Sequence, residues 1–199
     1  MLIPLLGAVY AVASLIPLNV ILGSSGSITL NIIVTPLIVL LTEPKVAVLS
    51  GFLGGVLSGY LPTQSPHLPF IIFKPVAGTL VGSISKRERL MDLLLASLYL
   101  SSVTILFYIR NFKQPFVTSL YLLGVGLLFL RNKIRKLEDY IVAYVSTISE
   151  HGYMCLYFTY IIPLPPEIFT LALPFTVIER SFATFLSVLL AKGIRSRLV

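Results

Sequence analysis

The chain has 199 residues, of which 56% are hydrophobic and only 12% are charged. A soluble domain carries about 25% charged residues, so this composition excludes a soluble domain and indicates one integral membrane unit with short loops. The formal net charge of +7 is explained by cations that interact with anionic lipids at a membrane surface. No nucleic-acid partner is predicted.

Eight apolar stretches follow one another along the chain, and each is predicted to cross the membrane as a helix. The first lacks a basic leader and a convincing cleavage site, so it is predicted to be a retained span. The second and third are joined only by Glu43-Pro44, where the proline predicts a tight turn between short or tilted helices. The stretches are roughly 1–22, 28–42, 45–61, 68–85, 90–109, 115–130, 140–162 and 168–191.

Lys and Arg are found mainly on alternate connections between these stretches. Cytoplasmic loops retain cations because translocating them is costly. The pattern therefore predicts an even number of spans, in the cell membrane, with both termini cytoplasmic. Of the 15 Lys and Arg residues, the even connections and the C-terminus carry Lys45, Lys86, Arg87, Arg89, Arg131, Lys133, Arg135, Lys136, Lys192, Arg195 and Arg197.

The third stretch is rich in glycine, with Gly51, Gly54, Gly55 and Gly59. Small residues at this density predict a close helix crossing, and a substrate wall is the less favoured alternative. The run from Arg131 to Asp139 has mixed charge and predicts a helix end that extends beyond the membrane.

One predicted external connection is uncharged and flexible. It contains Gly23, Ser24, Ser25, Gly26 and Ser27. Such a loop is either a lid over a membrane cavity or a plain surface loop.

Ionisable residues fall inside three of the predicted spans, at Lys74, at Glu150-His151 and at Glu179-Arg180. Charges at bilayer depth face a cavity or a partner. Neighbours on a helix point about 100° apart, so each adjacent pair is expected to divide between a cavity and another helix.

Two roles for these charges remain open from the sequence. In one role, the charges form interhelical ion pairs, Glu179 with Lys74 and Glu150 with Arg180, which hold the helices together. Contacts to a polar substrate are the other role, and the two roles are compatible. A proton relay through Glu150 and His151 is a weaker third reading.

Aromatic side chains gather at the end of the seventh stretch. Tyr153, Tyr157 and Tyr160 share one helical face. They are either interfacial anchors or a stacking surface for a flat ring.

The sequence contains no catalytic or metal-binding motif of the HExxH or GxSxG type. Its histidines, His67 and His151, lie apart, and its one cysteine is Cys155. No enzyme activity, cofactor or metal is predicted.

Three blocks resemble the substrate-binding S component of energy-coupling factor (ECF) vitamin transporters. ITLNIIVTPLIVLLTEPKVAVLSGFLGGVLSGYLP (28–62) is similar to the second and third helices of that family, and LPFIIFKPVAGTLVGSISKR (68–87) is similar to the fourth. Residues 148–192, with Pro174-Phe175 before a polar pair, resemble the last two helices.

The resemblance implies an all-α membrane protein with a six-helix core. Since this chain has eight apolar stretches, residues 1–85 and 138–192 would form the core of a single domain, 1–199, and residues 90–131 an inserted helical pair. In the family, small residues four apart on the first helix pack on a transmembrane coupling subunit. Gly7 and Ala11 match that spacing, and Ala8 adds to the small-residue surface.

The resemblance also implies a function. The chain would capture a small vitamin-like or cofactor-precursor molecule from outside, for uptake with a coupling subunit and ATPase subunits. The alternative is an accessory subunit of a larger membrane complex, with its charges paired between helices. The predicted substrate-binding residues are Asn31, Lys74, Glu150, His151, Tyr153, Tyr157, Glu179 and Arg180.

Overall fold

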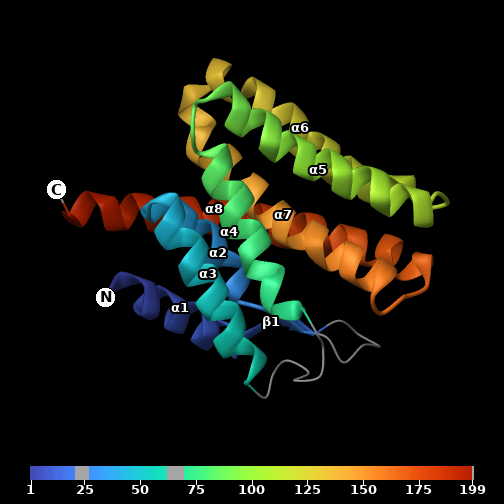
Figure 1. Cartoon of the computed structure of the whole chain (residues 1–199), viewed down its shortest axis with the longest axis horizontal. Helices are drawn as coiled ribbons and strands as arrows, with labels where there is room; N and C mark the ends of the chain where they lie inside the picture. The colour runs from blue at the N-terminus through green and yellow to red at the C-terminus, as the bar shows by residue number, and fades with distance from the viewer. Residues whose placement is uncertain (21–26, 62–69, 199) are drawn as a thin grey trace.

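The computed structural model describes residues 1–20, 27–61 and 70–198, which fold into α-helices and one small β-hairpin (Figure 1). Each apolar stretch of the sequence contributes one α-helix to the described chain. The helices are α1 (Leu2–Ala13), α2 (Asn31–Leu41), α3 (Pro44–Gly59), α4 (Lys74–Ser85), α5 (Leu90–Arg110), α6 (Ser119–Leu130), α7 (Glu138–Tyr160) and α8 (Pro166–Leu198). Short 3₁₀ turns, η1 (Ile71–Phe73) and η2 (Pro115–Thr118), lead into α4 and α6.

The first apolar stretch is not a single helix, which corrects the predicted span 1–22, while the described chain remains predominantly α-helical. The helix α1 ends at Ala13, and β1 (Pro17–Val20) then pairs antiparallel with β2 (Ser27–Thr29). Pro17 lacks an N–H and cannot continue a helix. Of the predicted lid, Ser27 is the first residue of β2, and residues 23–26 lie outside the described residues.

The helices α2, α4, α7 and α8 form the centre of the bundle. The helix α4 packs on α7, and α2 packs on both α7 and α8. The helices α1 and α3 pack together on one side. The helices α5 and α6 lie side by side on the opposite side, against α4 and α7 (Figure 1). Both chain ends lie at the left of that view.

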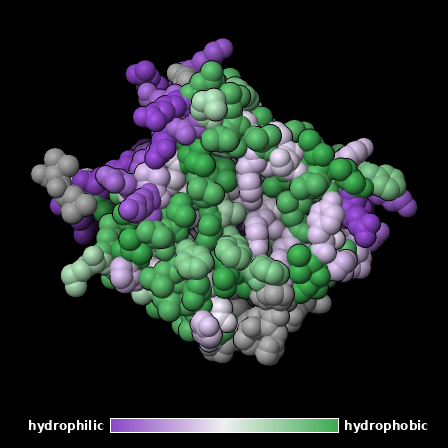
Figure 2. All heavy atoms as spheres, viewed as in Figure 1, coloured by the Kyte–Doolittle hydropathy of each residue, from purple (hydrophilic) through white to green (hydrophobic). Residues whose placement is uncertain are grey.

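The distribution of polarity is the reverse of that in a soluble protein. Large apolar side chains such as Leu98, Ile109, Leu171 and Ile178 are exposed, while polar and charged groups are buried. Figure 2 shows hydrophobic surface across the middle of the molecule and hydrophilic residues gathered mainly at the upper left. A bundle surrounded by lipid has this arrangement.

By length and composition, two helices of the described chain are able to cross a membrane, Leu90–Arg110 and Pro166–Arg197. Five shorter apolar helices accompany them. The number of crossings remains a prediction.

The glycines of α3 confirm the predicted close crossings. A Cβ on Gly54 would lie 2.8 Å from Cβ of Tyr10 in α1, and one on Gly51 would lie 2.6 Å from Oγ1 of Thr79 in α4. The backbones of three helices therefore approach closely at these positions. The turn before α3 is also confirmed, because Glu43 is extended and Pro44 is the first helical residue.

The connection between α6 and α7 differs from the predicted helix extension. Two 3₁₀ turns, η3 (Arg131–Lys133) and η4 (Arg135–Leu137), replace a continuous helix, and α7 begins at Glu138. The backbone of Ile134, with φ −120° and ψ 61°, interrupts the helical path. The side chain of Arg131, at the start of this connection, points into the bundle and is only 2% exposed.

Candidate functional site

An ion pair between α4 and α7 lies in the interior of the bundle. The Nζ of Lys74 is 3.2 Å from Oε1 of Glu150, whose side chain is 0% exposed, while that of Lys74 is 15% exposed. Lys74 is the first residue of α4, where the positive end of the helix dipole disfavours a cation. The carboxylate of Glu150 offsets both charges.

Glycine allows α4 and α7 to bring these side chains together. A Cβ on Gly78 would lie 3.0 Å from the Ser146 carbonyl oxygen and 3.2 Å from Cβ of Glu150. A Cβ on Gly82 would lie 2.6 Å from Cβ of Ser146. The hydroxyl of Ser146 donates to the Gly78 carbonyl at 3.0 Å. This contact fixes the register of the two helices one turn from the ion pair.

Arg180 reaches the same face of α7 from α8. Its Nη1 donates to the carbonyl oxygen of Thr147 at 3.1 Å and to its Oγ1 at 2.9 Å. Thr147 lies one turn before Glu150. Oε2 of Glu150 and Nε of Arg180 have no hydrogen-bond partner within the described chain. Buried polar atoms are usually satisfied, so these two atoms are available to a polar ligand.

The predicted ion pairs are therefore wrong in their partners. Lys74 pairs with Glu150, although the sequence suggested Glu179, and Arg180 binds Thr147, although the sequence suggested Glu150. Glu179 is half-buried beside Arg180 on α8. Sequence reasoning missed Thr147 because a neutral threonine in a helix carries no signal, apart from its place one turn before Glu150.

Asn31 joins the hairpin to the helices beneath it. It is the first residue of α2, and its side chain is fully buried. Oδ1 accepts a hydrogen bond from Oγ1 of Thr29 at 2.8 Å, and Nδ2 donates to the Tyr10 hydroxyl at 3.2 Å. Thr35, one turn further along α2, faces Gly78 of α4. Asn31 therefore lies between the hairpin and the ion pair.

Tyrosines of α7 lie next to the start of α4. The Tyr153 hydroxyl donates to the Phe70 carbonyl at 2.7 Å. Phe70 has φ 64°, a left-handed conformation that is costly for a bulky residue and often found at functional sites. The rings of Tyr153 and Tyr157 stack with centroids 6.5 Å apart. The hydroxyl of Tyr157 is buried and has no hydrogen-bond partner in the described chain.

Tyr160 contacts a different helix from Tyr153 and Tyr157. Its hydroxyl donates to the Leu106 carbonyl of α5 at 2.7 Å. The predicted face of three tyrosines is therefore reduced to Tyr153 and Tyr157.

His151 faces away from the ion pair. Its Nδ1 is 3.0 Å from the Tyr121 hydroxyl of α6, and its Nε2 is 3.6 Å from Sγ of Cys155. The expectation that adjacent residues divide between different neighbours is confirmed for Glu150 and His151. The structure does not bring these two side chains together for a proton relay, nor does it bring His151 to the other predicted substrate residues.

Two of the three small residues predicted to meet a partner subunit pack within the chain. A Cβ on Gly7 would lie 3.1 Å from the side chain of Leu53 in α3, and Ala11 is buried. Gly7 therefore packs against α3 within the chain, and the packing of Gly7, Ala8 and Ala11 on a coupling subunit stays a prediction. Ala8 is exposed, together with Leu5 and Val12.

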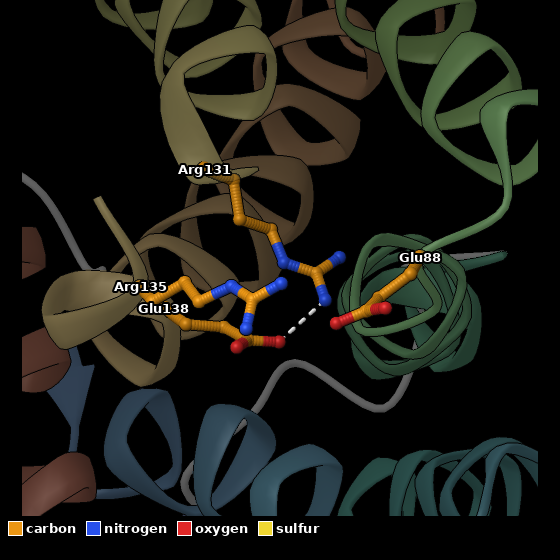
Figure 3. Close-up of a pocket in the computed structure, with 4 residues that line it drawn as sticks. All are labelled: Glu88, Arg131, Arg135 and Glu138. Atoms are coloured by element: carbon orange, nitrogen blue, oxygen red, sulfur yellow. Dashed lines mark hydrogen bonds and ion pairs between the residues drawn. The ribbon is translucent and has the colours of Figure 1, made fainter. Parts of the chain in front are cut away.

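The basic end of the molecule holds a second charged cluster, shown in Figure 3. Glu88, Arg131, Arg135 and Glu138 line a pocket of about 180 Å³. The guanidinium of Arg131 forms an ion pair with Glu138. It also donates to the carbonyl oxygens of Ser85, Lys86 and Arg87 at the end of α4.

Two further cations bind carbonyl groups at the end of α2. Nζ of Lys86 donates to the carbonyl oxygens of Val39, Leu40 and Thr42, each at 3.1 Å. Arg195 of α8 donates to the Leu40 carbonyl at 2.7 Å and to Asp139 at 2.9 Å. These cations satisfy carbonyls that a helix end leaves unpaired. The charge pattern of the sequence therefore has a structural role.

The ECF-type riboflavin transporter S component family matches residues 1–111, which is more than half of the chain. No curated protein and no solved structure matches it. S components of ECF transporters are substrate-binding membrane subunits, not enzymes, and they work with a transmembrane coupling subunit and ATPases. The chain belongs to the ECF-type riboflavin transporter S component family, and it is a multi-pass substrate-binding membrane subunit.

Proposed function

We propose that this subunit captures a small vitamin-like or cofactor-precursor molecule, a flavin in the first instance, from the outer side of the membrane. The ligand would lie among the β-hairpin, α4, α7 and α8. Both termini would be cytoplasmic, and the chain would cross the membrane eight times. Uptake would use a separate coupling subunit and ATPases, since the chain has no nucleotide-binding motif.

The observation that carries the proposal is a set of buried polar atoms on α7 and α8. Oε2 of Glu150, Nε of Arg180 and the hydroxyl of Tyr157 all lack hydrogen-bond partners in the described chain. Small-molecule sites are mostly apolar and hold a few convergent polar groups. The stacked pair of Tyr153 and Tyr157 adds aromatic surface that suits a flat heterocycle.

Each side chain has a definite role in this proposal. Arg180 and Glu150 would donate to and accept from polar edges of the ligand, and Lys74 would hold the Glu150 carboxylate in position through their ion pair. Tyr157 would contribute its hydroxyl and its ring. Asn31 would anchor the described part of the hairpin beside the ligand. Glu179 would contribute charge beside Arg180, and His151 is left out.

The test is a binding measurement on the purified protein in mild detergent. Native mass spectrometry followed by denaturing extraction identifies any retained small molecule, and quenching of flavin fluorescence measures affinity for riboflavin. Stoichiometric binding of a vitamin-sized molecule is expected. Protein that stays folded but binds neither a retained molecule nor added riboflavin would overturn the flavin assignment.

Tyr157→Phe is the sharpest variant for this site. Its hydroxyl has no partner in the described chain, so its loss is expected to leave the unfolding temperature unchanged. If the hydroxyl binds the ligand, affinity is expected to fall by about tenfold. Tyr144→Phe is the matched control, because its hydroxyl donates to the Leu120 carbonyl away from the proposed site. Equal affinity in wild type and Tyr157→Phe would remove Tyr157 from the site.

The accessory-subunit alternative is favoured by one observation, the direct pairing of Lys74 with the fully buried Glu150. In that interpretation the charged side chains pair with one another between helices and contact no ligand. It predicts that Lys74→Met with Glu150→Gln leaves every binding property unchanged.

A further inference from the structure

A second pocket lies at the basic end, between the α2–α3 turn and the end of α4. Its volume is about 420 Å³, and it is lined by Leu41, Thr42, Glu43, Pro44, Ser83, Lys86 and Arg87. It is separate from the proposed substrate site, since its α4 residues lie at the opposite end of that helix from Lys74.

The pocket and the start of α3 beside it offer donors suited to an anion. The hydroxyl of Ser83 is a buried polar group, 1% exposed, with no hydrogen-bond partner within the described chain. The helix α3 begins at Pro44, and no side chain caps its N-terminus, so the amides of Lys45 and Val46 lie in the first turn, where N–H groups have no acceptor within the helix. Exposed Arg87 adds a full positive charge.

Exposed apolar side chains of α3 and α4 lie one helical turn further from this end of the molecule. Leu80, one turn before Ser83 on α4, is 44% exposed, and Leu49, one turn beyond Lys45 on α3, is 42% exposed. A ligand that occupied the pocket would therefore meet cations and amides at one end and hydrocarbon at the other. This combination matches an amphipathic anion.

We infer that this pocket binds the headgroup of an anionic phospholipid, with the phosphate between the start of α3, Ser83 and Arg87 and the acyl chains along Leu49 and Leu80. Basic pockets between membrane helices recognise lipids of this kind. Lys86 has a positioning role, because it is already bonded to three carbonyls of the α2 end. The carboxylate of Glu43 repels an anionic headgroup and so lowers the affinity of the pocket for it.

The test is a titration of the detergent-purified full chain with phosphatidylglycerol, read by native mass spectrometry. One tightly retained lipid per chain is expected. Arg87→Gln is expected to weaken binding about fivefold, the effect of one cation at a membrane surface. Ser83→Ala is expected to weaken it about tenfold, through the loss of one hydrogen bond to a charged group. Glu43→Gln is expected to strengthen it.

The matched control is Arg197→Gln, which removes the same charge from an exposed position of α8 outside the pocket. It is expected to leave the affinity unchanged. If Arg197→Gln and Arg87→Gln weaken binding equally, or Ser83→Ala has no effect, diffuse surface charge explains the binding and the proposal fails. Equal affinity for phosphatidylcholine overturns it as well. Displacement of the lipid by millimolar glycerol phosphate would assign the pocket to a soluble phosphate and contradict the lipid assignment.

Discussion

Nζ of Lys74 lies 3.2 Å from Oε1 of Glu150 and joins the first residue of α4 to the middle of α7. Removing one partner of a buried pair leaves an uncompensated charge, which costs about 3–5 kcal/mol. Lys74→Met is therefore expected to lower the unfolding temperature strongly. The double variant with Glu150→Gln is expected to recover most of the loss, as measured by thermal unfolding in detergent.

The control for this cycle is Lys113→Met, because Lys113 is exposed and its substitution should be nearly neutral. Additive effects of the two core substitutions would show that the pair contributes no coupling energy.

The contact between Gly55 and Ile72 predicts a steric effect on stability. A Cβ on Gly55 would lie 2.2 Å from the Ile72 carbonyl oxygen, so α3 must move away from η1 in Gly55→Ala. The variant is expected to lose at least about 2 kcal/mol, as overpacked cores do. Gly126→Ala is the matched control, since nothing lies within 4 Å of its added Cβ, and it should be neutral or slightly stabilising. Equal unfolding temperatures for the two variants would contradict the close crossing.

The contacts of Arg131 predict that a lysine at this position would make the protein less stable. Its guanidinium bonds at the same time to Glu138 and to three successive carbonyls at the end of α4. A lysine ammonium lacks the planar fork needed for this arrangement, so Arg131→Lys is expected to destabilise by about 1–3 kcal/mol. Arg135→Lys, at an exposed position of the same connection, should be close to neutral. Limited proteolysis between α4 and α5 would report the loosening.

Lys86 predicts a dependence of stability on pH. Burial lowers the pKa of Lys86 below its usual 10.5, Arg195 lowers it further, and Asp139 and Glu138 oppose the shift. Between the folded pKa and 10.5 the unfolded chain binds more protons, so stability rises with pH. The unfolding temperature of wild type relative to Lys86→Arg is expected to increase as pH rises towards 10.5. A difference that stays constant or decreases would contradict the lowered pKa.

The local features of this chain were predictable because they depend on neighbouring residues. The Gly54 crossing follows from residue size, the Pro44 turn from a missing N–H, and the divergence of Glu150 and His151 from helical geometry. Features that depend on the register between distant segments were not predictable. The partner of Glu150 depends on how α4 slides along α7, which Gly78 and Ser146 fix.

Two other features depend on distant segments in the same way. The end of α1 at Ala13 depends on a pairing of Pro17 with Thr29, which hydropathy does not report. The spacing of Gly7 and Ala11 predicts a smooth helix face but does not identify the helix that covers it. In this chain Gly7 packs against Leu53 of α3.

The cations that bind helix ends make membrane insertion and stability inseparable in this protein. Lys86, Arg131 and Arg195 belong to the charge pattern from which orientation is read, and each also holds backbone carbonyls of another helix. Relocating these charges to invert the protein in the membrane would release the ends of α2 and α4 as well. A loss of function after such relocation would therefore report a loosened bundle as readily as a reversed orientation, and only exposed cations such as Lys133 can be moved to test orientation alone.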